Sequence, residues 1–438
     1  MNVDIVQKNR DLRRYGEKSS FDAFFWAAFA LLLAAVTYIY YWEAVSDFSD
    51  IHLHAAIASG FDFLDLHSIT SRIVYPFWHV NYAVLYKLGV PFVWAAAIVC
   101  VAYKTLVFVL VQRILYLYLA PEFSAKLATL GALAAMFVTA VRIPSVNPTV
   151  YIGIGSPNVW HNPTQIVAIL SSLLCVFYTA HCVYHYQSNR GAAGAAGMLP
   201  WKKTAMLSAL LLFSVVCKPT FMQAFLPACG VYFLILWIKN PKHTRFFLQI
   251  ILAFLPTVVY FLMQYLYYTG VVVPFTSGIA VSLDPARLWI AIRNLLMMAA
   301  FPLLTLLLTT KKGALREPVL ALVLLITAAA VLEAYLFYET GMRENNGNFN
   351  WASMNAAFLL WVIALPRFFR AVQEFRFDQA RLQEDAKKGV LPSATLSRAQ
   401  TRLRAQSAGF LAAMFLLLWH LYSGMYYLYY LFSTVNVF

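Results

Sequence analysis

The chain has 438 residues, of which 61% are hydrophobic and only 12% are charged. So little polar surface cannot cover the apolar side chains of a water-soluble globule, so lipid must be the solvent for most of the chain. The formal net charge of +14 would suit a nucleic-acid partner only if the cations gathered on one soluble face. They lie instead in short polar segments between apolar runs, and we expect an all-α, polytopic membrane protein that binds no nucleic acid.

Apolar runs long enough to cross about 30 Å of hydrocarbon recur along the chain and predict a single transmembrane domain over residues 1–438. The eleven predicted spans lie at 21–41, 91–113, 125–141, 165–185, 203–218, 222–238, 246–267, 288–309, 318–338, 353–366 and 408–432. Because no small-residue cleavage pattern follows the first run, we expect it to be retained as a span.

The positions of Lys and Arg predict the orientation. With residues 1–20 in the cytoplasm and the C-terminus outside, the cytoplasmic segments hold 25 of the 33 Lys and Arg residues. The most basic of these segments is 367–407, which is typical of a helix on an anionic leaflet or of a solvated charged connector. We expect a bacterial plasma membrane.

One short apolar segment, 75–89, would reverse this orientation if it crossed the membrane. It begins beside Pro76, carries His79 and Lys87, and is rich in Tyr and Trp. We therefore expect an interfacial helix on the outer surface. It would be the second surface helix of a first extracytoplasmic loop over 42–90.

That first loop concentrates carboxylates and imidazoles. Asp47 and Asp50 are three residues apart and Asp50 and His54 are four apart, so a helix would place them on one face. Carboxylates beside imidazoles can act as general bases or hold a metal. The alternative is that Asp50 is only the N-cap of a surface helix. We expect Asp50, and next Asp47, to be catalytic, with His52 and His54 as substrate contacts.

The second outer loop, 142–164, is rich in Pro, Gly and Asn and predicts irregular backbone. Its residues Trp160 and Asn162 also suit an aromatic belt and a helix start. Asn158 and His161 remain as candidates for hydrogen bonds to a substrate.

The third outer loop, 338–355, combines several Asn residues, among them Asn348, with Phe349 and Trp351. Amides beside aromatic rings are typical of sugar-binding sites, although an ordinary polar loop has the same composition.

Lys218 lies between an apolar run and Pro219, near the outer end of a predicted span. A lysine there either extends to the headgroups or pairs with an anion. The cations expected on the outer side, which together suit a lipid phosphate, are Arg72, Arg142, Lys218, Arg287, Arg293 and Arg343.

The layout of the first 120 residues resembles the GT-C membrane glycosyltransferases. The matching stretches are WEAVSDFSDIHLHAAIA, with Glu43, Asp47 and Asp50, and the proline-led YPFWHVNYAVLYKLGVP at 75–91. The resemblance implies a GT-C-like fold with juxtamembrane helices in the first extracytoplasmic loop. It also implies that the enzyme transfers a sugar from a polyprenyl-phosphate carrier to a glycan, lipid or protein acceptor on the outer side.

In that mechanism an aspartate is the general base and a cation contacts the lipid phosphate. We expect Asp50 as base, with Asp47 as the alternative. No cofactor or structural metal is expected, and a divalent cation at the acidic loop is the alternative to a metal-free site. The expected substrate- and phosphate-binding residues are Arg72, Lys218, Arg343, His52, His54, His79, His161, Asn162, Glu43 and Asn348.

Two other functions fit the same composition. A polysaccharide polymerase or ligase would use outer-loop Arg and His residues on lipid-linked glycans. A transporter or flippase would use charged residues within spans, for which Lys104 and Glu333 are the candidates. The sequence shows no internal repeat and no paired broken helices, and this favours the glycosyltransferase.

Overall fold

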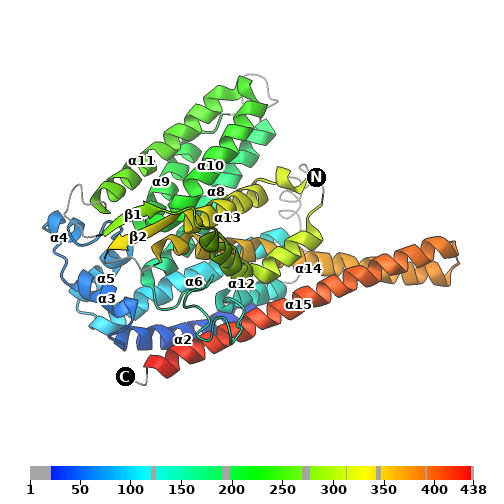
Figure 1. Cartoon of the computed structure of the whole chain (residues 1–438), viewed down its shortest axis with the longest axis horizontal. Coiled ribbons are helices and arrows are strands. Elements are labelled where there is room, and N and C mark those ends of the chain that lie inside the picture. The colour runs from blue at the N-terminus through cyan, green and yellow to red at the C-terminus, as the bar shows by residue number, and fades with distance from the viewer. Residues whose placement is uncertain are drawn as a thin grey trace.

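The computed structural model describes residues 21–119, 125–189, 198–268, 277–311, 313–341, 347–389 and 392–435. Most of these residues form α-helices packed into one bundle (Figure 1). The helices are α2 (Ala23–Val45), α3 (Asp50–Ser59), α4 (Leu66–Thr70), α5 (Phe77–Lys87), α6 (Phe92–Leu119), α7 (Ala125–Phe137), α8 (Pro163–Asn189), α9 (Trp201–Cys217), α10 (Pro219–Lys239), α11 (Thr244–Tyr268), α12 (Pro285–Thr309), α13 (Pro318–Leu336), α14 (Trp351–Lys387) and α15 (Ser393–Val435).

Among the described residues, nine helices are long and apolar enough to cross a membrane. The predicted polytopic, helical membrane protein is therefore confirmed, but the predicted count of eleven spans is not. Two of the predicted spans correspond to α7, with 13 residues, and α9, with 17 residues. At 1.5 Å per residue these helices are about 20 and 25 Å long, less than the hydrocarbon thickness.

The described parts of the predicted outer and cytoplasmic segments lie at opposite ends of the bundle. At one end, which we call the loop end, the turn before α5 meets the end of α11, where the Tyr267 hydroxyl donates to the Ser71 carbonyl at 2.7 Å. At the other end, which we call the basic end, Glu317 before α13 pairs with Arg367 on α14. The loop end holds α3, α4 and α5, the starts of α8, α10 and α14, and the end of α13.

A small β-sheet at the loop end departs from the all-α expectation. Strands β1 (Ser277–Val281) and β2 (Phe337–Gly341) pair antiparallel. Strand β1 lies between two predicted spans, and β2 begins at the end of the predicted span 318–338. The Arg287 side chain donates to the carbonyls of Ala334 and Phe337. Arg287, one of the cations expected on the outer side, thus caps the last turn of α13.

The two C-terminal helices are longer than a membrane crossing. α14 has 37 residues and α15 has 43, so α14 spans about 55 Å. Buried residues on α14 extend from Ala352 to Phe368, and the rest of the helix is mostly exposed. Figure 1 shows both helices continuing together past the bundle, so that most of the basic segment 367–407 lies in these two helices.

Candidate functional site

The start of α3 sets the position of the Asp50 side chain. The alternative interpretation, that Asp50 is only an N-cap, is wrong, because Ser49 is the N-cap of α3 and its hydroxyl accepts from the Ile51 amide at 3.2 Å. The Ser49 hydroxyl also donates to the Glu43 carboxylate at 2.7 Å, which makes Glu43 a buried support for the turn between α2 and α3. Asp50 is the first residue of the helix, where the helix dipole favours a carboxylate, and its side chain has a different partner.

That partner is Asn162, which connects Asp50 to Lys218. The Asn162 side-chain amide donates to Asp50 Oδ2 at 2.8 Å. The Asn162 side-chain carbonyl accepts from Lys218 Nζ at 3.2 Å. One amide therefore lies between a carboxylate and an ammonium group that are 168 positions apart in the sequence, and it satisfies both.

Local structure fixes Asn162 in this position. Its side-chain carbonyl also accepts from the Gln165 amide at 3.0 Å and from the Thr164 hydroxyl at 2.8 Å. These bonds satisfy groups in the first turn of α8, while Pro163 occupies the first helical position, where no backbone N–H is needed. The predicted helix start and the predicted substrate-site role thus fall on the same side chain.

Lys218 is the single residue between α9 and α10. Its backbone is extended, with φ −169° and ψ 127°, and Pro219 begins the next helix. The side chain is only 5% exposed, so it does not extend to the headgroups as the alternative interpretation required.

The third outer loop joins the site through an aromatic ring. Lys218 Nζ lies 3.8 Å from the centroid of the Trp351 ring, a cation–π contact. The Trp351 indole N–H donates to the Asn348 side-chain carbonyl at 3.1 Å. The Asn348 amide in turn donates to both Glu339 carboxylate oxygens at 2.8 Å. Asn348 therefore orients Trp351 and so reaches Lys218 indirectly.

Three imidazoles surround this group. His54 Nδ1 lies 2.8 Å from His79 Nε2, a hydrogen bond between α3 and α5 in which one ring donates and the other accepts. The His79 ring is fully buried. His161 Nδ1 lies 3.2 Å from the Tyr427 hydroxyl on α15.

Burial governs the ionisation of these groups. It lowers the pKa of the Lys218 ammonium to about 7, and the Asp50 carboxylate opposes this shift. Burial lowers the pKa of His54 to about 4, although the Asp50 carboxylate again opposes the shift. Burial also lowers the pKa of His79 and of His161. The three imidazoles are therefore neutral at neutral pH, and Lys218 titrates near it.

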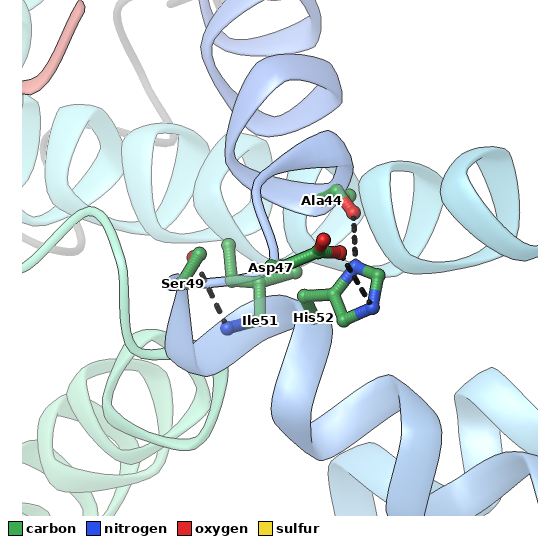
Figure 2. Close-up of polar contacts among 5 residues, drawn as sticks. All are labelled: Ala44, Asp47, Ser49, Ile51 and His52. Atoms are coloured by element: carbon green, nitrogen blue, oxygen red, sulfur yellow. Dashed lines mark hydrogen bonds and ion pairs between the residues drawn. The ribbon is translucent and has the colours of Figure 1, made fainter. Parts of the chain in front are cut away.

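Asp47 and His52 lie apart from this group. Figure 2 shows the His52 ring linked to the Ala44 carbonyl and to the Asp47 carboxylate. His52 Nδ1 lies 3.0 Å from the Ala44 carbonyl oxygen, and His52 Nε2 lies 3.3 Å from the Asp47 carboxylate. The Asp47 side chain is 84% exposed. This pair holds the turn between α2 and α3, whereas the Asp50 side chain contacts Asn162.

Two arginines, Arg72 and Arg343, are predicted to contact the phosphate together with Lys218. No contact among the described residues joins either of them to Lys218. Arg72 is exposed, and its guanidinium packs over Gly60, where an added Cβ would lie 2.6 Å from Nη1. Arg343 lies outside the described residues.

Asn158 is predicted to bind substrate, but its side chain makes hydrogen bonds to other residues of the protein. Its amide donates to the carbonyls of Ala135 and Val138 at 2.7 and 2.9 Å, and it accepts from Lys104 Nζ at 2.6 Å. Asn158 thus satisfies the end of α7, and Lys104, the transporter candidate, is paired. No sequence pattern signals the contribution of Tyr427 from α15, because it lies 266 positions after His161.

The described residues contain no group of three or more His, Cys, Asp or Glu side chains arranged to hold a metal ion. The chain matches no protein-family model, no curated protein and no solved structure.

Proposed function

We propose that this protein is a membrane glycosyltransferase of the GT-C type. It transfers a sugar from a polyprenyl-phosphate donor to an acceptor hydroxyl at the loop end of the bundle, which faces away from the cytoplasm. The proposal depends on one observation: a partly exposed carboxylate, Asp50, and a buried ammonium, Lys218, share the Asn162 amide.

These two groups suit the two halves of the reaction. Asp50 accepts the proton of the attacking hydroxyl while the acceptor oxygen forms a bond to the anomeric carbon. The bond between that carbon and the phosphate oxygen breaks, and its electron pair leaves with the phosphate. Lys218 stabilises the negative charge that develops there, and burial strengthens the interaction because water screens it little.

The neighbouring groups support this division of roles. Asn162 holds the carboxylate and the ammonium apart, so Asp50 is available as a base. The Trp351 ring covers Lys218 on another side, and the neutral imidazole pair of His54 and His79 packs beside Asp50 without competing for its proton. Exposed Asp47, in contact with His52, is the matched carboxylate that lacks these contacts.

The test measures release of free polyprenyl phosphate by the purified protein from a panel of polyprenyl-phosphate sugars. We expect Asp50→Asn to reduce release about 100-fold or more, the usual contribution of a general base. Asp47→Asn should change it less than about threefold, since an exposed ion pair contributes little. Unchanged release in Asp50→Asn would remove the assignment.

The same panel separates the other functions. Turnover only with oligosaccharide-pyrophosphate lipids would identify a polymerase or ligase. No turnover with any donor, together with solute flux across vesicles that contain the protein, would identify a transporter.

A further inference from the structure

Five polar side chains lie in helix ends at the loop end of the bundle and have buried atoms without a hydrogen-bond partner among the described residues. The atoms are Gln165 Nε2 and Oε1, Thr220 Oγ1, Gln223 Oε1, both Glu333 carboxylate oxygens, and Asn355 Nδ2 and Oδ1. We call these five residues the helix-end cluster. Gln165 and Asn355 are 0% exposed and Glu333 is 7% exposed. A buried polar group without a partner costs folding free energy, so the cluster does not contribute to stability.

The cluster residues come from four helix ends that meet at the loop end. Gln165 and Thr220 lie in the first turns of α8 and α10, Gln223 lies one turn further along α10, Asn355 lies near the start of α14, and Glu333 lies in the last turn of α13. Helix α13 packs against α8, α10 and α14. All five residues therefore lie at a similar depth, within about two turns of the same end.

The contacts of Lys218 connect these helix ends. Its bond to Asn162 joins α10 to the start of α8, and its contact with Trp351 joins α10 to the start of α14. The Ser353 hydroxyl donates to the Ala330 carbonyl at 3.2 Å, which joins α14 to the end of α13.

Helical periodicity places two cluster residues, Asn355 and Glu333, on helix faces that take part in the contacts at the loop end. Asn355 follows Trp351 by four residues and so lies on the face of α14 that contacts Lys218. Glu333 follows Ala330 by three residues and lies on the face of α13 that contacts α14. The cluster thus lies deeper in the bundle than Lys218.

The chemistry of the unpartnered atoms selects the ligand. Gln165 and Asn355 offer amide N–H donors, which a metal ion cannot use, while Glu333 and Thr220 offer oxygen acceptors. A hydroxyl group both donates and accepts, and the two oxygens of one carboxylate can accept from two adjacent hydroxyls. A ring with several hydroxyls and no charge satisfies donors and acceptors together.

We infer that the helix-end cluster binds the sugar ring of the donor, with Lys218 at the adjoining phosphate. This inference rests on the proposed function and deepens it, because it names the residues that would select the sugar. It places the sugar among helix ends, and of the cluster residues only Asn355 belongs to the segment 338–355, where the sequence predicts sugar binding. Glu333, a transporter candidate by sequence, is then a specificity residue.

The test uses the purified full chain and two lipids, polyprenyl phosphate and the same lipid carrying a neutral hexose. We expect Glu333→Gln to weaken binding of the hexose lipid about 10-fold or more, because the glutamine amide puts an NH₂ donor where the carboxyl group has an oxygen that can accept from a sugar hydroxyl. Binding of polyprenyl phosphate should change less than about twofold. Asn355→Leu should show the same selectivity, and Lys218→Met should weaken both lipids.

Glu317→Gln is the matched control, because it makes the same replacement at the residue that precedes the first turn of α13. It should leave the affinities for both lipids unchanged. Thermal unfolding checks that each variant is folded. If Glu333→Gln and Asn355→Leu affect the two lipids equally or not at all, the inference is wrong, while a loss in Lys218→Met still supports the proposed function. If the wild-type protein binds neither lipid, the proposed function itself falls.

Discussion

The side-chain amide of Asn162 donates a 2.8 Å hydrogen bond to the carboxylate of Asp50, across 112 positions of sequence. This bond joins the first loop-end helix to the start of α8. Because the same amide accepts from Lys218, the distance between the carboxylate and the ammonium depends on one residue.

Replacing Asn162 should separate a structural role from a functional one. Asn162→Asp keeps an N-cap acceptor for α8 but places a second carboxylate against Asp50. We expect the melting temperature to change little, and the acidic limb of the pH–rate profile to move to higher pH, because a like charge raises the pKa of a carboxyl group. Asn162→Leu should lower both stability, by about 1 kcal/mol for the lost cap, and activity. An unchanged profile in Asn162→Asp would show that Asn162 does not position Asp50.

Binding of polyprenyl phosphate should weaken above neutral pH. Burial lowers the pKa of Lys218 to about 7, so the cation is present below that pH and is lost as the pH rises through it. Affinity should then fall by up to about 10-fold per pH unit between pH 7 and 9. Lys218→Arg should bind with a flatter profile over this range, since a guanidinium stays charged. Equal slopes for the two proteins, measured by equilibrium binding, would contradict the role of Lys218.

The imidazole pair should make stability depend on mildly acidic pH. Burial lowers the pKa of His54 to about 4 from an ordinary value of 6.5. Between these values the unfolded chain binds a proton that the folded chain does not, so the contribution to stability is full above about pH 6.5 and is lost as the pH falls toward 4. The melting temperature should therefore fall between pH 7 and 5, and fall less in the variant that carries both His54→Gln and His79→Gln. An equal fall in the variant would assign the effect to other groups.

The pair of Lys104 and Asn158 should matter for folding and not for turnover. Asn158→Ala leaves the buried Lys104 ammonium and the last carbonyls of α7 without their partner, and such losses cost about 3–5 kcal/mol. We expect low yield and a lower melting temperature, while release of polyprenyl phosphate per folded molecule stays within about threefold of wild type. If Asn158→Ala is instead stable but inactive, Asn158 belongs to the substrate-binding site.

The sequence predicts the helices well because hydrophobic runs, caps and prolines are local signals. The two surface helices expected in 42–90 are present as α3 and α5, and Pro163 and Pro219 begin α8 and α10 as their residue type favours. The count of spans is less certain from sequence, because an apolar run continues through 125–141 although the helix ends at Phe137.

The candidate site is predicted only in part, because its contacts are long-range. Carboxylates, imidazoles and Lys218 are visible in the sequence as polar residues that a membrane protein would otherwise avoid. Which of them meet depends on packing. Spacing alone places Asp47 and Asp50 together, yet Ser49 caps the helix and the two carboxylates have different partners. The helix-end cluster has no sequence signature, since Gln165 and Asn355 resemble ordinary residues of helix ends.

Lys218 is the only residue between α9 and α10, so its Cα is anchored from both sides and has no spare length of chain on which to move. In the proposed reaction, an ammonium that Asn162 and Trp351 also hold would need little reorganisation as charge develops near it. A single residue inserted at this junction would turn the Lys218 side chain away from Asn162.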